Sequence, residues 1–186
     1  MAQNPFRQPC VPTRHSNVKW LFERKPQVDG WTVPTFKEEA AQIYTDVGAA
    51  LAAADEKQLR MLTTPSCYAT MAASLRERPG GQKQRWQTLD VSTSVVQVRI
   101  GHHASFPERR FAQVTCSIDA KLVWTITDKK GKSIGGLGTR DQPHASKDWW
   151  VFERCISAPP EPPRWRLKER IAVEAKLEEE NRDGEL

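Results

Sequence analysis

The hydrophobic positions along the chain change their period near residue 81, and this change separates expected helices from expected strands. Before it, apolar residues recur at steps of three and four, most clearly over 40–51, which is typical of an amphipathic helix. After it, from 112 to 127, apolar residues stand at every second position, which is typical of a strand with one buried face. The pattern therefore predicts helices first and strands afterwards.

Three helices are expected in the first part of the domain. The first covers about 35–54, because Thr35 and Glu38 have the spacing of a capping box directly before the periodic positions. Asp55 is the expected N-cap of a second, short helix. A third begins at the Thr-Pro pair at the start of 64–81, since proline is tolerated at the first helical position, and ends at the Pro-Gly-Gly sequence.

The second part of the domain predicts an antiparallel sheet. Residues 86–100 indicate one or two strands, and over 112–127 all eight even positions are apolar while seven of the eight odd positions are polar. Residues 128–131 predict a hairpin turn, and further strands are expected over 147–157 and 164–171. The fold class is therefore α+β, with N-terminal helices packed on one face of a curved antiparallel sheet. Trp124 and Trp150 are expected to be buried on the inner face of that sheet.

Composition and charge divide the chain into three expected parts. Residues 1–34 hold five prolines and no hydrophobic period, which predicts an extended basic arm. Residues 35–171 form the α+β domain, and 172–186 an acidic helical tail. Residues 1–170 carry 26 Lys and Arg against 17 Asp and Glu, whereas 171–186 carry two against six. A basic body suggests a polyanionic partner, with nucleic acid first and anionic lipid next; a solvated charged surface is an equal alternative.

Two groups of basic residues are candidates for contact with RNA. Lys and Arg neutralise phosphates, and aromatic side chains can stack on unpaired bases. The first group lies in the arm, where Trp20 and Phe22 stand among the cations. The second follows the third helix, where a plain solvated loop is an equal alternative. Together the candidates are Arg7, Arg14, Lys19, Arg24, Lys25, Arg76, Arg78, Lys83 and Arg85.

No motif in the sequence indicates catalysis or a metal site. Gly131-Lys132-Ser133 ends like a phosphate-binding loop, but the pattern's first glycine is missing and a hairpin surrounds it. His102 and His103 would point to opposite faces of a strand, so they cannot share one metal ion from there. The inner face of 112–126 carries no ionisable group except Cys116. We therefore expect no enzyme activity, cofactor, metal or small-molecule substrate.

A pocket enzyme of the isomerase or dehydratase type remains an alternative from another class. Helices packed over a curved sheet can enclose a pocket, and such enzymes place a carboxylate, tyrosine or histidine inside it. An Asp, Tyr or His lining the pocket would favour this alternative.

The cysteines and the N-terminal segment bear on the compartment. The four cysteines contain no CxxC pair, and a domain of this length needs no disulfide framework, so reduced thiols are expected. No apolar run approaches the roughly 18 residues of a membrane span, which argues against an integral membrane protein. Residues 1–25 lack the apolar stretch of a secretory signal. Their prolines disfavour the amphipathic helix of a transit peptide, so we interpret them as a retained basic arm.

Two segments near the C-terminal end resemble a known family. The sequences Lys-Asp-Trp-Trp-Val-Phe-Glu-Arg over 147–154 and Pro-Pro-Arg-Trp-Arg-Leu over 162–167 are similar to two consecutive strands of the Tim44-like superfamily. Residues 44–68 resemble its paired-helix opening, so the resemblance covers about 36–171. The residues assigned to the motif core on this basis are Trp124, Trp149, Trp150, Phe152 and Trp165.

The resemblance implies a cone-like α+β domain, similar to nuclear transport factor two, with an apolar pocket; the sequence does not tell whether that pocket holds lipid or peptide. It also implies a mitochondrial matrix location at the periphery of the inner membrane. The family includes a subunit of the protein import motor and a protein of the large mitochondrial ribosomal subunit. The import subunit carries a long charged helical half before the domain, and this chain has a 34-residue arm there, which favours the ribosomal member.

The match to the ribosomal member implies a structural role near the polypeptide exit, holding the ribosome at the inner membrane. Its expected partners are ribosomal RNA, neighbouring mitoribosomal proteins and, peripherally, the inner-membrane surface or an insertase. A peripheral adaptor of the import motor is the alternative.

Overall fold

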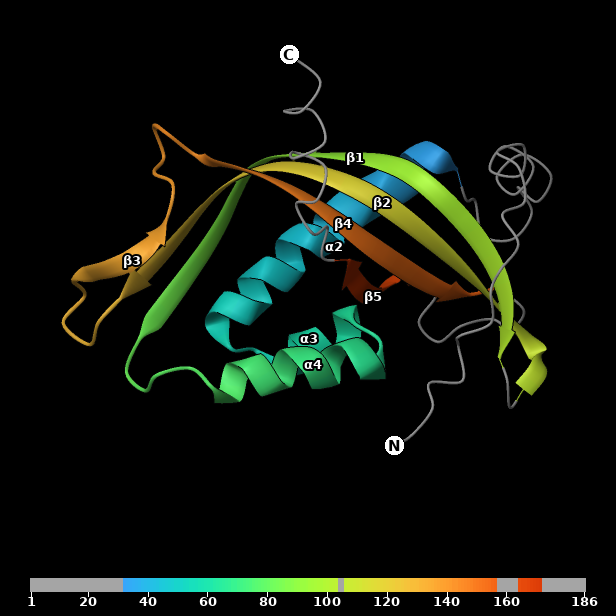
Figure 1. Cartoon of the computed structure of the whole chain (residues 1–186), viewed down its shortest axis with the longest axis horizontal. Helices are drawn as coiled ribbons and strands as arrows, with labels where there is room; N and C mark the ends of the chain where they lie inside the picture. Colours follow the sequence, from blue (N-terminus) through green and yellow to red (C-terminus); the bar gives the residue numbers. More distant parts are fainter. Residues whose placement is uncertain (1–31, 104–105, 157–163, 172–186) are drawn as a thin grey trace, which may run out of the picture.

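The structure is a computed structural model and describes residues 32–103, 106–156 and 164–171. The predictions made for residues 1–31 and for the tail over 172–186 lie outside the described residues. The described part holds three helices followed by five strands, as Figure 1 shows. Their bounds are α2 (Val33–Ala53), α3 (Glu56–Leu62), α4 (Pro65–Arg76), β1 (Lys83–His103), β2 (Phe106–Thr127), β3 (Ser133–Leu137), β4 (His144–Cys155) and β5 (Arg166–Ile171).

The first helix begins earlier than the sequence pattern predicts. Thr32, not Thr35, is the N-cap: the Thr35 N–H donates to Thr32 Oγ1 at 3.2 Å, and the Thr32 N–H donates to Thr35 Oγ1 at 3.0 Å. Pro34 fits inside the first turn because its missing N–H would have no intrahelical partner there. The expected capping box of Thr35 and Glu38 is therefore wrong by one helical turn, and the helix extends over residues assigned to the arm.

The five strands form one antiparallel sheet that arches over α2 (Figure 1). The strand order is β1-β2-β4-β5, and β3 pairs with β2. Two of the three register shifts between β1 and β2, those near Leu89 and Val96, insert an extra residue in β1. Such bulges bend a strand and increase its twist, which accounts for the curvature of the sheet and for the exposure of both side chains.

β1 pairs with one edge of β2, and the strand that pairs with the other edge changes along the length of β2. β4 pairs with β2 from Phe111 to Leu122, and β3 pairs with it from Trp124 to Thr127. The sequence pattern missed β3, because its five residues include two glycines and are all exposed, so no alternation of apolar and polar positions marks it. The Asp128–Gly131 turn is confirmed and joins β2 to β3; Gly131 has a φ of +79°, which favours glycine.

The hydrophobic core lies between α2 and the inner face of the sheet. Phe36 packs edge-on against Trp165 with ring centroids 4.7 Å apart, and against Phe152 at 5.9 Å. The start of β5 is held by a backbone hydrogen bond as well: the Thr64 N–H donates to the Leu167 carbonyl at 2.8 Å. These long-range contacts join both ends of the domain, and the predicted α+β architecture is confirmed.

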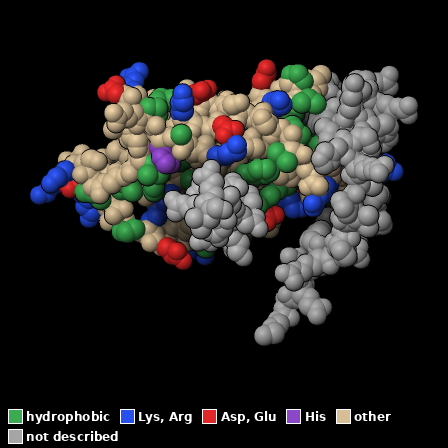
Figure 2. All heavy atoms as spheres, turned by 45° about the horizontal axis from the view of Figure 1, so that its top comes forward, with side chains coloured by type: hydrophobic (Ala, Val, Ile, Leu, Met, Phe, Trp, Pro, Cys, Tyr) green, Lys and Arg blue, Asp and Glu red, His purple; other side chains and the backbone are tan. Residues whose placement is uncertain are grey.

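The motif residues fall into three environments. Trp150, Phe152 and Trp165 are buried in the core. Trp149 is half-buried on the outer face of β4, because successive residues of a strand point to opposite faces. Trp124 is on the inner face but only half-buried, so the prediction of its burial is wrong; the core does not extend beneath it. The outer face carries scattered charges of both signs (Figure 2).

Candidate functional site

A cavity of about 360 Å³ lies beneath the sheet, beside the C-terminal half of α2. Its walls come from α2, the start of β1, the second half of β2, β3, β4 and the end of β5. They are mainly apolar and aromatic, so the pocket implied by the family resemblance is present. The side chains that line it include Tyr44, Val47, Leu51, Trp86, Leu122, Trp124, Leu137 and Trp150.

Aromatic rings define the wall on both sides of Tyr44. The centroid of its ring is 4.8 Å from that of Trp150 and 6.2 Å from that of Trp86. Gly48 of α2 permits this arrangement, because a Cβ at that position would overlap the Trp86 indole. The buried Trp150 Nε1 has no hydrogen-bond partner among the described residues. The pocket thus offers flat aromatic surface.

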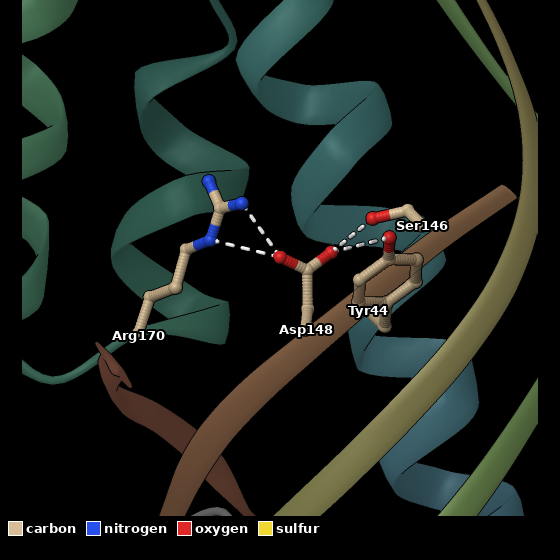
Figure 3. A network of polar contacts seen from close by, with 4 residues as sticks. All are labelled: Tyr44, Ser146, Asp148 and Arg170. Carbon is tan, nitrogen blue, oxygen red and sulfur yellow. Dashed lines mark hydrogen bonds and ion pairs between the residues drawn. The ribbon is translucent and has the colours of Figure 1, made fainter. Parts of the chain in front are cut away.

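Asp148 is the polar centre of the pocket wall (Figure 3). Its Oδ2 accepts hydrogen bonds from the Tyr44 hydroxyl at 3.0 Å and from the Ser146 hydroxyl at 2.8 Å. Its Oδ1 accepts from Arg170 Nε at 3.1 Å and Nη2 at 2.6 Å. The network joins α2, β4 and β5. A buried carboxylate is tolerated in this setting because a guanidinium and two hydroxyls replace its water.

Tyr44 is held in its protonated form. Burial raises the pKa of its hydroxyl, and the negative charge of Asp148 raises it further. The hydroxyl therefore donates to Asp148 throughout the neutral range. An efficient general acid or base has a pKa near the working pH, and Tyr44 is far from that condition.

The pocket contains the residue types that would favour a pocket enzyme. Tyr44, His144 and Asp148 all line it, so that condition is met. The inner face of 112–126 carries no ionisable group other than Cys116, as expected. The ionisable residues of the pocket come from α2 and β4 instead. In the observed network Asp148 already accepts four hydrogen bonds, and Tyr44 donates its proton inward. This arrangement holds three elements together, and it leaves neither of these two groups poised to transfer a proton.

Asp148 could have been recognised from the sequence. It stands two residues before Trp150 and four before Phe152, so strand alternation puts all three on the inner face. The sequence prediction considered inward ionisable groups on β2 alone and therefore missed it. The partner Tyr44 lies 104 residues away in the chain, and no local pattern connects the two.

The described RNA candidates do not share one environment. Arg76, Lys83 and Arg85 are exposed to solvent. Arg78 is half-buried at the pocket wall, where its Nη1 donates to the Ala52 carbonyl at 3.3 Å and burial lowers its pKa. Because the last carbonyls of a helix attract cations, Arg78 caps α2 rather than extending into solvent. The candidates Arg7, Arg14, Lys19, Arg24 and Lys25 lie outside the described residues.

The described residues contain no group of three or more His, Cys, Asp and Glu side chains arranged to hold a metal ion. Within the same part of the chain, no helix combines the length and the apolar character needed to cross a membrane.

Comparisons with known proteins identify relatives of this chain. The family described as Tim44-like domain matches residues 22–172. The protein named large ribosomal subunit protein mL45 of Drosophila melanogaster is 29% identical over 140 residues, which cover 73% of this chain and 36% of the relative. The protein of the same name from Xenopus tropicalis is 29% identical over 143 residues, covering 76% of this chain and 43% of the relative. The chain thus spans less than half the length of these curated relatives.

Among solved structures, the chain is similar to the intermembrane space region of the chloroplast protein ARC6. The TM-score is 0.39 at 12% sequence identity, and the match covers 74% of this chain and 97% of that chain.

Proposed function

The chain belongs to the Tim44-like domain family, and from that premise we propose that it is a structural, non-enzymatic protein of the large mitochondrial ribosomal subunit. In this role it binds ribosomal RNA and neighbouring ribosomal proteins near the polypeptide exit, in the matrix, and helps to hold the ribosome at the inner membrane. The observation that carries the proposal is the match of about three quarters of the chain to relatives named as large ribosomal subunit proteins.

The chemistry of the pocket supports a role without catalysis. Asp148 is fully engaged by Tyr44, Ser146 and Arg170, and the raised pKa of Tyr44 keeps its proton in place at neutral pH. The network connects α2 to β4 and β5, so its contribution is to the rigidity of the domain.

The arm remains part of the proposal. Its five cations, Arg7, Arg14, Lys19, Arg24 and Lys25, would neutralise RNA phosphates. Replacing all five by Gln should then weaken ribosome association and flatten its salt dependence. The log–log slope should fall by roughly 0.7–0.9 for each phosphate that is no longer neutralised.

Sedimentation of the tagged full chain tests the proposed function. Mitochondria are isolated from cells that express the tagged chain, and their lysate is separated on a sucrose gradient at low and at high salt. We expect the chain to migrate with the large ribosomal subunit, more completely at low salt because phosphate contacts are screened by ions. A chain that stays in the light fractions at both salt concentrations contradicts the proposal. Its presence in those light fractions together with import-motor components would favour the adaptor role.

A further inference from the structure

Five cations gather at the end of the sheet that lies beyond the core. Lys83 and Arg85 open β1, and the strand register pairs them with Thr127 and Thr125 of β2. The β2–β3 turn, which follows β2 directly, adds three lysines. We call this set the basic end: Lys83, Arg85, Lys129, Lys130 and Lys132. Figure 2 shows Lys and Arg side chains at the left end of the molecule, where β3 and its turn lie in Figure 1.

The turn that carries the three lysines has a defined shape. Asp128 Oδ1 accepts from the backbone N–H groups of Lys130 at 2.8 Å and Lys132 at 2.9 Å. Lys129 lies against the backbone of Gly81, where a Cβ would overlap its side chain. The hairpin is therefore tied to the connection between α4 and β1, and the lysines are presented from a fixed turn.

The cations of the basic end are exposed and unpaired. All five residues are solvent-exposed, and none forms an ion pair with a carboxylate in the described part of the chain. Some cations elsewhere on the sheet are paired: Lys147 lies 3.6 Å from Asp119, and Lys168 lies 2.8 Å from Glu153. The basic end thus brings five exposed cations together, and they can meet a polyanion without first breaking a salt bridge.

The side chains between these cations suit a phosphate backbone. Trp86 and Trp124 line the pocket, so strand alternation places Arg85 and Thr125 on the opposite, outer face. Protein contacts to phosphate and sugar come from Lys and Arg, from Ser and Thr hydroxyls and from backbone N–H groups. Double-stranded RNA is recognised largely through such contacts and through its shape.

A lipid surface fits the basic end less well. Stable attachment to a bilayer needs an apolar face or a second anchoring signal in addition to basic residues. The outer positions beside Lys83 and Arg85 are threonines, and Leu137 of β3 faces the pocket on the inner side. Ile134 alone offers an exposed apolar side chain on the hairpin outside the pocket wall, within the described residues.

We propose that the basic end is an RNA-binding surface that holds the phosphate backbone of a ribosomal RNA helix. The inference deepens the proposed function, on which it rests, by naming the part of the folded domain that contacts RNA. Lys129, Lys130 and Lys132 are its new members, and they act together with Lys83 and Arg85. Arg78, which caps α2, is not part of this surface.

The test compares two full-length variants that each lose three positive charges. The first is Lys129→Gln/Lys130→Gln/Lys132→Gln, and the control is Lys57→Gln/Lys121→Gln/Lys147→Gln, which removes exposed cations from other parts of the domain. Binding to an RNA duplex of about 20 base pairs is measured over a range of salt concentrations. We expect the first variant to bind about tenfold or more weakly at low salt, with a log–log salt slope reduced by about 2 to 3. The control should stay close to the unmodified chain.

Three results would overturn the inference. One is an unchanged affinity and slope in the hairpin variant, and another is an equal loss in the control, which would indicate a general charge effect. The third is a hairpin variant that still binds the duplex but no longer binds vesicles of phosphatidylcholine and cardiolipin, which the unmodified chain binds. That result would make the basic end a membrane contact. The fate of the proposed function is read separately on the sucrose gradient. If the unmodified chain leaves the large subunit, that function fails even where duplex binding depends on the hairpin.

Discussion

The two halves of β2 carry the same alternating sequence and have different surroundings. From Ala112 to Leu122 the inner side chains are at most 5% exposed, whereas Trp124 and Ile126 are half-buried. The first half is covered by α2 and flanked by β4. The second half extends past the last residue that pairs with β4 and is flanked by the short, exposed β3.

This difference separates the direction of a side chain from its burial. Alternation determines which face a residue points to, but the length of the covering helix and of the neighbouring strand determines whether that face is dry. We infer that the covered half supplies most of the stability of the domain. The uncovered half leaves room for the pocket on its inner face and for exposed cations on its outer face.

The largest expected effect is the loss of a large side chain from β4, beside the covered half of β2, where Phe152 pairs with Val114. Phe152 is fully buried and contacts the rings of Phe36 and Trp150. Phe152→Ala should lower the free energy of unfolding by about 3–5 kcal/mol, since it removes apolar contact and leaves a cavity. Chemical denaturation measures this loss. The adjacent, outward-facing Val151→Ala is the control, with about 1 kcal/mol or less; equal losses in the two variants would show that the covered half is not the core.

The next effect is a loss of stability at alkaline pH, which comes from Cys116 in the covered half and from Cys67 of α4. Burial raises the pKa of Cys116 to about 12 and that of Cys67 to about 11, against 9.0 for a free thiol. Both thiols stay protonated in the folded state while they ionise in the unfolded state. Stability is therefore complete below pH 9 and falls as pH rises towards 11 and 12, by about 1.4 kcal/mol for each thiol at pH 10.

Denaturation curves recorded from pH 8 to pH 10 measure this loss. Cys116→Ala should be less stable at pH 8 because it leaves a small cavity, but its stability should fall less steeply with pH. An identical pH dependence in the variant and the unmodified chain would mean that Cys116 does not remain protonated in the folded state.

The polar network around Asp148, which pairs with Ile118 of the covered half, should have an intermediate effect. Asp148→Asn keeps the size of the side chain but removes its charge, and its amide N–H₂ must face either the hydroxyl donors of Tyr44 and Ser146 or the guanidinium of Arg170. The expected cost is about 1–3 kcal/mol, because buried donors lose their acceptors. Ser146→Ala removes one hydrogen bond to the same carboxylate and should cost about 1 kcal/mol. Thermal and chemical unfolding of both variants measure the difference; a neutral Asp148→Asn would assign the network no structural role.

The same comparison shows how far the sequence alone could lead. The face of every inner residue from Ala112 to Ile126 followed from alternation, and Asp55 was correctly identified as the cap of α3. The burial of Trp124 did not follow, since alternation contains no information on where α2 stops covering the sheet. The strand β3 escaped detection because its glycine-rich, exposed residues need only backbone pairing with β2.

The candidate sites depend on contacts between distant parts of the chain. The turn lysines at 129, 130 and 132 are visible in the sequence, but their proximity to Lys83 and Arg85 comes from the pairing of β1 with β2. Likewise, the contact of Tyr44 with Asp148 depends on how α2 crosses the sheet. Local patterns therefore predicted the elements, while the sites required the register and the packing.

The smallest expected effect is at Trp124, in the uncovered half of β2. Its neighbours are Trp86 across the strand pair and Leu137 of β3, and the cavity lies on its inner side. Because its side chain is only partly buried and lines the cavity, Trp124→Ala should cost about 1–2 kcal/mol rather than the 3–5 kcal/mol of a buried aromatic residue. Chemical denaturation of Trp124→Ala and Phe152→Ala in parallel compares the two losses in the free energy of unfolding directly. A loss at Trp124 as large as at Phe152 would mean that the core extends to the end of the sheet, and the separation of a covered from an uncovered half would then fail.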